Sequence, residues 1–154
     1  MKKFLLLFLF AAFVVLSCNK DNYGPIPTIS FESWSLPSID SNTAVVNAFF
    51  RVKDGDGDID SAIFYRIHYF IANPATDTAR FGMKHMAGIG ENTGKSVNAQ
   101  VKLPLEKIDF VRWIEHTEDR PDSMWMEVFI QDRAGNISDT ITTKKIPIFK
   151  KRAP

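Results

Sequence analysis

The strongest constraint on this chain is the alternation of apolar and polar residues in several short segments. Within 96–103 the apolar positions are Val97, Ala99, Val101 and Leu103, and the residues between them are polar. Successive side chains of a β-strand point to opposite faces, so this period of two predicts a strand that buries one face. The same alternation, or a high content of β-branched and aromatic residues, predicts further strands at 28–33, 43–54, 62–71, 80–86, 124–130 and 138–149.

The order of these segments predicts the fold class. Turn residues separate them and no long helical period occurs, which favours an all-β fold. We expect an antiparallel sandwich of two sheets with about seven strands. The inward residues of its core are expected to include Val46, Phe50, Val101, Val128 and Ile130.

Two stretches depart from regular alternation. In the last predicted strand the apolar positions change phase between Ile141 and Ile146, which predicts a bulge, and Pro147 favours an edge position. The pattern of 104–119 is irregular. It fits either one helical turn that starts at Pro104 or a loop that covers part of the sandwich.

A run of carboxylates follows the strand predicted for 43–54. We call residues 54–60 the aspartate loop; its acidic positions alternate as Asp54, Asp56, Asp58 and Asp60. Clustered carboxylate oxygens are the ligands that Ca²⁺ prefers. An EF-hand is excluded, because Ile59 stands in place of the required glycine and Tyr65 in place of the final glutamate. A calcium loop at one end of the sandwich and a polar turn rich in Asp and Gly remain as alternatives.

The N-terminus has the pattern of a bacterial secretory leader. Lys2 and Lys3 precede an apolar run over 4–16, and a helix of that length rises only ~20 Å, less than the ~30 Å hydrocarbon core of a bilayer. This predicts a cleaved signal peptide over 1–17. The sequence before Cys18, the only cysteine, resembles a lipobox, although ordinary cleavage beside an incidental cysteine is the alternative. Several acyl chains on Cys18 would anchor the protein stably.

The leader, the aspartate loop and the hairpin residues 132–136 together resemble small lipoproteins of the Bacteroidetes that carry a single immunoglobulin-like or fibronectin-III-like domain. The resemblance implies a lipidated Cys18 and tether over 18–27 and an Ig-like sandwich over 28–150. It implies an outer membrane lipoprotein on the periplasmic or cell-surface face. The cysteine pair and tryptophan of antibody domains are missing, so the domain would be a disulfide-free relative.

The 132–136 hairpin is expected to complete the candidate metal site. Gly135 is the residue expected to adopt a positive φ. In an Ig-like sandwich the loop after the second strand and the loop before the last strand lie at the same end. We therefore expect Asp132 and Asn136 to lie beside the aspartate loop and to add ligands to a Ca²⁺ ion.

Other functions are constrained more weakly. The formal net charge of +1 gives no reason to expect nucleic acid as a partner. The three histidines lie on separate segments and no hydrolase motif occurs, so we expect no enzyme. Trp125 and Phe129 have the opposite parity to the inward set of their strand, which places them on the outer face of the sheet. There they either form a surface for a glycan or an envelope protein, or Trp125 is covered by the irregular 104–119 segment. The expected function is a lipid-anchored binding or interaction module, and the alternative is a carbohydrate-binding accessory of surface glycan uptake.

Overall fold

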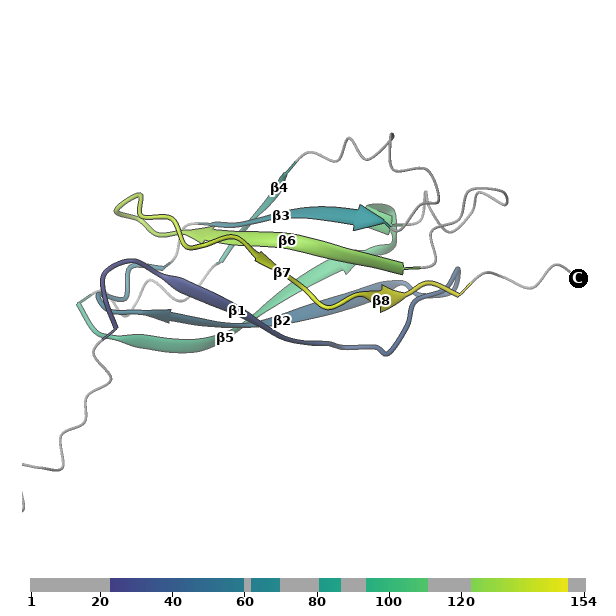
Figure 1. Cartoon of the computed structure of the whole chain (residues 1–154), viewed down its shortest axis with the longest axis horizontal. Helices are drawn as coiled ribbons and strands as arrows, with labels where there is room; N and C mark the ends of the chain where they lie inside the picture. Colours follow the sequence, from purple (N-terminus) through teal and green to yellow (C-terminus); the bar gives the residue numbers. More distant parts are fainter. Residues whose placement is uncertain (1–22, 60–61, 70–80, 87–93, 111–122, 150–154) are drawn as a thin grey trace, which may run out of the picture.

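The computed structural model describes residues 23–59, 62–69, 81–86, 94–110 and 123–149, which form two antiparallel sheets packed face to face (Figure 1). One sheet has the order β1-β2-β5, and its strands are β1 (Thr28–Trp34), β2 (Val45–Asp54) and β5 (Val97–Glu106). The other has the order β4-β3-β6-β7, with β8 also paired to β6. Its strands are β3 (Ala62–Tyr69), β4 (Gly82–His85), β6 (Ser123–Gln131), β7 (Ile141–Thr142) and β8 (Ile146–Pro147).

The predicted all-β sandwich is therefore confirmed. β2 pairs with β5 in the first sheet, and β3 pairs with β6 in the second. In the Ig-like fold, strands B and E pair in one sheet and strands C, F and G form the other. Here β2 and β5 take the places of B and E, and β3, β6 and β7 take those of C, F and G. At one end of the sandwich, on the left in Figure 1, β1 begins, β2 ends and β6 turns towards β7.

The alternation of the sequence decides which side chains fill the space between the sheets. In β2 every second residue from Val46 to Asp54 is buried, and the residues between them are partly exposed. The predicted core residues Val46, Phe50, Val101, Val128 and Ile130 are all buried. Burial of this apolar surface is the main stabilising contribution to a sandwich of this size.

The last predicted strand is interrupted rather than bulged. β7 and β8 both pair with β6, and Thr143 bridges the interval between them. The backbone N–H of Met126 donates to Thr143 Oγ1 at 2.9 Å, and Thr143 N–H donates to the Met126 carbonyl at 2.9 Å. A side-chain oxygen thus replaces one strand carbonyl, which allows the apolar phase to change before Ile146.

The stretch from Pro104 also differs from the prediction. β5 continues through Pro104 to Glu106, and helical residues begin only at 107. Leu103 and Leu105 are both buried, so the alternation carries on past the proline. An edge strand tolerates proline because one side of its backbone needs no partner in the ladder. In the part of the chain that the structure describes, no helix is long and apolar enough to cross a membrane.

Several predicted features lie outside the described residues. They include the leader, Cys18, the first part of the tether, Asp60 and residues 111–119 of the irregular segment.

Candidate metal centre

The candidate centre begins with Asp54, the last residue of β2. The alternation that buries the core residues of β2 also places Asp54 on the inward face, where its exposed fraction is 0%. Its Oδ2 accepts hydrogen bonds from the backbone N–H groups of Gly57 at 2.7 Å and Asp58 at 3.3 Å. Gly57 has a φ of 72°, a conformation that favours glycine. The backbone therefore turns tightly around the Asp54 carboxylate.

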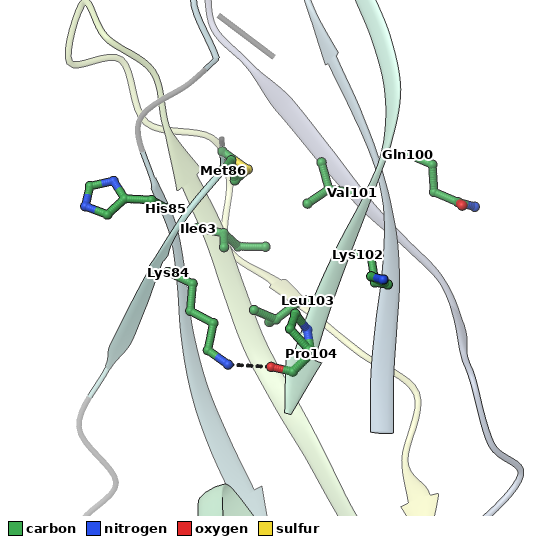
Figure 2. Close-up of a pocket in the computed structure, with 9 residues that line it drawn as sticks. All are labelled: Ile63, Lys84, His85, Met86, Gln100, Val101, Lys102, Leu103 and Pro104. Atoms are coloured by element: carbon green, nitrogen blue, oxygen red, sulfur yellow. Dashed lines mark hydrogen bonds between the residues drawn. The ribbon is translucent and has the colours of Figure 1, made fainter. Parts of the chain in front are cut away.

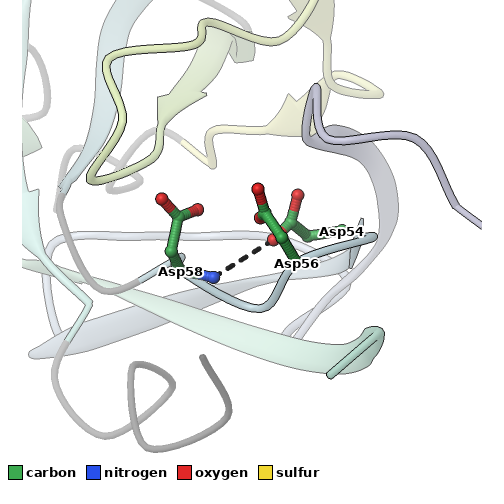
Figure 3. Close-up of side chains that lie close together, drawn as sticks. All are labelled: Asp54, Asp56 and Asp58. Carbon is green, nitrogen blue, oxygen red and sulfur yellow. Dashed lines mark hydrogen bonds between the residues drawn. The ribbon is translucent and has the colours of Figure 1, made fainter. Parts of the chain in front are cut away.

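Two further carboxylates join Asp54 within the same turn. One oxygen from each of Asp54, Asp56 and Asp58 can be chosen so that all three lie within 4.8 Å of one another. Figure 3 shows the three carboxylates on the same side of the loop. Asp58 is only 9% exposed, and Asp56 is half-buried. Three acidic groups thus face one small volume at the end of the sandwich.

The charges in this volume lack compensation. The Oδ1 atom of each of these three aspartates is buried and has no hydrogen-bond partner among the described residues. Burying a carboxylate oxygen without a partner is costly, so such groups attract a proton or a cation. Consistently, burial and, to a smaller extent, the neighbouring Asp56 carboxyl raise the pKa of Asp54 to about 6. Burial also raises the pKa of Asp58, followed by the negative charges of Asp132 and Asp56.

The 132–136 hairpin lies beside the aspartate loop, as expected from the topology. Asp58 Oδ2 accepts a hydrogen bond from Ala134 N–H at 3.0 Å, and Arg133 N–H donates to the Asp58 carbonyl at 3.1 Å. Gly135 has a φ of 92°, which confirms its predicted positive φ. Asp58 therefore belongs to the cluster through one oxygen and holds the hairpin through the other.

Asp132 and Asn136 mainly close their own turn. Asp132 Oδ1 accepts from Asn136 N–H at 2.7 Å, and its Oδ2 accepts from Asn136 Nδ2 at 2.8 Å. Asp132 is 2% exposed and close enough to Asp58 to raise the pKa of that carboxyl. The structure thus groups Asp54, Asp56 and Asp58, with Asp132 and Asn136 as neighbours that support the loop. Asp60 lies outside the described residues.

A contact that the sequence did not predict involves the end of the tether. The backbone N–H of Gly55 donates to the Gly24 carbonyl at 2.9 Å, and Asn136 Nδ2 donates to the Pro25 carbonyl at 3.3 Å. The aspartate loop, the hairpin and the tether therefore meet at one end of the sandwich. The glycines of the loop were the only available signal, because glycine permits close approach of another backbone.

The predicted aromatic surface lies on the outer face of the second sheet. Trp125 and Phe129 are half-buried there and alternate with the buried residues of β6. Phe129 stacks on Phe64 with 4.8 Å between ring centroids. Trp125 stacks on His68 at 5.6 Å and lies 4.8 Å from the Lys145 ammonium. These rings thus engage neighbours of the same chain rather than forming a flat, open shelf.

A cavity of about 350 Å³ lies between the edges of β4 and β5. Its lining mixes apolar residues such as Ile63 and Leu103 with polar ones such as His85. The Lys84 ammonium donates to the Pro104 carbonyl (Figure 2). That hydrogen bond links the two sheets at their open side.

Comparisons with known proteins add little to this geometry. No family model matches the sequence, and no curated protein matches it. Among solved structures, the chain resembles part of the crystal structure of the sporulation control protein Spo0M from Bacillus subtilis, with a TM-score of 0.45 and 8% sequence identity. The match covers 82% of this chain and 50% of that protein, so this chain spans about half its length.

Proposed function

We propose that this chain is a lipid-anchored protein of the cell envelope whose Ig-like domain is a binding or interaction module stabilised by Ca²⁺ at one end. The observation that carries the calcium assignment is the set of unpartnered, buried Oδ1 atoms on Asp54, Asp56 and Asp58. A divalent cation would convert their mutual repulsion into attraction. The tether enters at this same end of the domain.

The donor set favours calcium over other common metals. All three grouped ligands are carboxylates, whereas structural zinc sites use mainly thiolate and imidazole. Ca²⁺ accepts 6–8 oxygen ligands in flexible geometry, and waters and backbone carbonyls commonly complete its shell. Mg²⁺ requires a near-ideal octahedron and gives up its waters reluctantly. A loop with three carboxylates at the end of the domain suits the weaker calcium sites of extracellular modules, whose Kd is about 0.1–1 mM.

Calcium binding is tested directly by calorimetric titration of the full chain in detergent micelles after treatment with chelator. We expect one site, with a Kd of about 1 mM or tighter, because three carboxylates converge on it. Asp56→Asn removes one ligand charge without changing the size of the side chain, and it should weaken binding at least ~10-fold, the cost of about 1.4 kcal/mol.

The matched control is Glu106→Gln, which removes the same charge elsewhere. Glu106 is exposed and pairs with Val45 at the start of β2, whereas Asp54 ends that strand. Glu106→Gln should therefore bind Ca²⁺ like the wild type. If the wild type releases no heat with calcium and Asp56→Asn behaves identically, the loop is a polar turn and the calcium assignment is wrong.

The lipid anchor is tested separately. A labelled fatty acid supplied to a bacterial host should enter the wild-type protein and should not enter Cys18→Ala, because the cysteine is the acceptor. Cys18→Ala should also move from the membrane fraction to the soluble envelope fraction, since it loses its acyl chains. Equal labelling of both proteins would contradict the anchor.

The alternative, a carbohydrate-binding accessory lipoprotein, has less support. Sugar binding by stacking uses open aromatic faces, and the rings of Phe129 and Trp125 already contact Phe64 and His68. Phe81 packs edge-on against Phe129 at 5.3 Å. This outer face therefore favours a protein contact over a flat sugar ring, and the partner belongs to the envelope if the anchor is present.

A further inference from the structure

The last residues of the tether are held by the elements that form the candidate metal centre. Gly55, which follows the first carboxylate, donates its N–H to Gly24, and Asn136 of the hairpin donates to Pro25. Tyr23 makes two further contacts: its hydroxyl accepts from Asn98 Nδ2 at 3.3 Å, and its ring lies 5.2 Å from the Lys53 ammonium. Residues 23–25 are thus docked by contacts with β2, β5, the aspartate loop and the hairpin.

The sequence of the aspartate loop is adapted to this docking. A Cβ atom on residue 55 would lie 2.1 Å from the Tyr23 carbonyl oxygen and 2.6 Å from the Gly24 carbonyl oxygen, both backbone atoms. Gly55 is not among the glycines with positive φ, so the backbone conformation itself does not require glycine there. The close passage of the tether is therefore the reason for glycine at this position.

We infer that cation binding at Asp54, Asp56 and Asp58 and docking of residues 23–25 are coupled, so that Ca²⁺ controls how firmly the domain is held against its membrane tether. This inference rests on the calcium site proposed above. Asp54 and Asp56 flank Gly55, and Asp58 holds the hairpin that carries Asn136. A cation that draws the carboxylates together would fix both donors to the tether, and repulsion in its absence would loosen both.

Coupling of this kind is reciprocal. If Ca²⁺ favours docking of the tether, then loss of docking must weaken Ca²⁺ binding by the same factor. A substitution at Gly55 should therefore lower calcium affinity although it removes no carboxylate. Because residue 55 lies between two of the carboxylates, a variant whose contact with the tether is outside the loop, Asn98→Ala, separates coupling from a local effect on the loop.

The test measures cleavage of the Tyr23–Gly24 bond in the full chain, in detergent micelles, by a protease that cuts after aromatic residues. Calcium at a saturating concentration, about a hundred times the Kd found by calorimetry, should slow cleavage of this bond about fivefold or more relative to chelator, the lower range of typical coupling. Gly55→Ala should be cleaved rapidly in both buffers and should bind Ca²⁺ about fivefold more weakly in calorimetry. Glu106→Gln is the control: Glu106 pairs with the other end of β2 from Asp54 and the variant leaves the cleaved bond unchanged, so calcium should protect it as it protects the wild type.

A second variant covers the case in which Gly55→Ala does not fold. Asn98→Ala removes only an exposed hydrogen bond to the Tyr23 hydroxyl, and it should reduce the calcium-dependent protection in the same direction. If the wild type binds Ca²⁺ and the bond is cleaved equally fast in both buffers, the coupling is wrong and the metal site stands. If the wild type binds no Ca²⁺, both proposals are overturned.

Discussion

Replacing Phe50 by alanine is expected to lower the free energy of unfolding by about 3–5 kcal/mol, the usual cost of removing a large buried aromatic side chain. Phe50 lies in the middle of β2, has an exposed fraction of 0%, and pairs with Phe31 on one side and Val101 on the other. Its ring meets that of Phe31 edge-on at 5.8 Å. The cavity left by alanine would open in the centre of the core. Denaturant unfolding of the full chain in calcium would measure the loss.

Phe149→Ala is the matched control for this experiment. It makes the same chemical change at a side chain that is 62% exposed, so it should alter stability by less than about 0.5 kcal/mol. A loss below about 1 kcal/mol for Phe50→Ala would show that the two sheets can close over the missing ring. The strict burial of the alternate β2 residues argues against such closure.

The parts of the fold that the sequence predicted are those governed by short-range pattern. The period of two in β2, β5 and β6 is a local property, and it correctly assigned Phe50, Val101 and Val128 to the interior. The pattern was less informative where a side chain takes over a backbone role. Thr143 does so between β7 and β8, and no local signal distinguishes this from a bulge. The strand predicted for 96–103 was expected to stop before Pro104, because the pattern of 104–119 is irregular, whereas β5 continues to Glu106.

The candidate centre was also predicted only in part. The alternation of Asp54, Asp56 and Asp58 and the topology of the fold together predicted that these residues would meet the 132–136 hairpin. The burial of Asp54 follows from the β2 alternation only once the strand is known to extend that far. The docking of residues 23–25 depends on contacts between segments far apart in sequence, and no pattern within either segment reports such a contact.

The electrostatics of the centre make its stability depend on pH in a defined direction. A folded pKa of about 6 for Asp54, above its ordinary value of 3.8, means that the folded state binds more protons than the unfolded state between these values. In chelator this group therefore stabilises the fold at low pH, and its contribution is lost as the pH rises through about 6. Lowered pKa values at Glu32, Asp40 and Glu127 act in the opposite sense as the pH falls. Comparing the pH dependence of the wild type with that of Asp56→Asn separates the contribution of the aspartate loop from that of the carboxyls with lowered pKa values.

Calcium should raise the melting temperature of the full chain by on the order of 10 °C at neutral pH, relative to chelator. Binding only to the folded state adds about 2.7 kcal/mol at a hundredfold excess over the Kd. The shift should shrink as the pH falls below about 6, because protons then compete with the cation for Asp54 and its neighbours. Thermal unfolding followed by circular dichroism at several pH values would measure both effects.

Asp56→Asn should melt at a higher temperature than the wild type in chelator and at a lower temperature than the wild type in calcium. In chelator at neutral pH it should melt higher, because one of the repelling carboxylates beside Asp54 and Asp58 is gone. In calcium it should melt lower, because it has lost a ligand charge. Glu106→Gln, at the far end of the same sheet, should follow the wild type in both buffers. Wild-type curves that coincide in calcium and in chelator, with Asp56→Asn on one side of them throughout, would mean that the three carboxylates shape a turn and hold no metal.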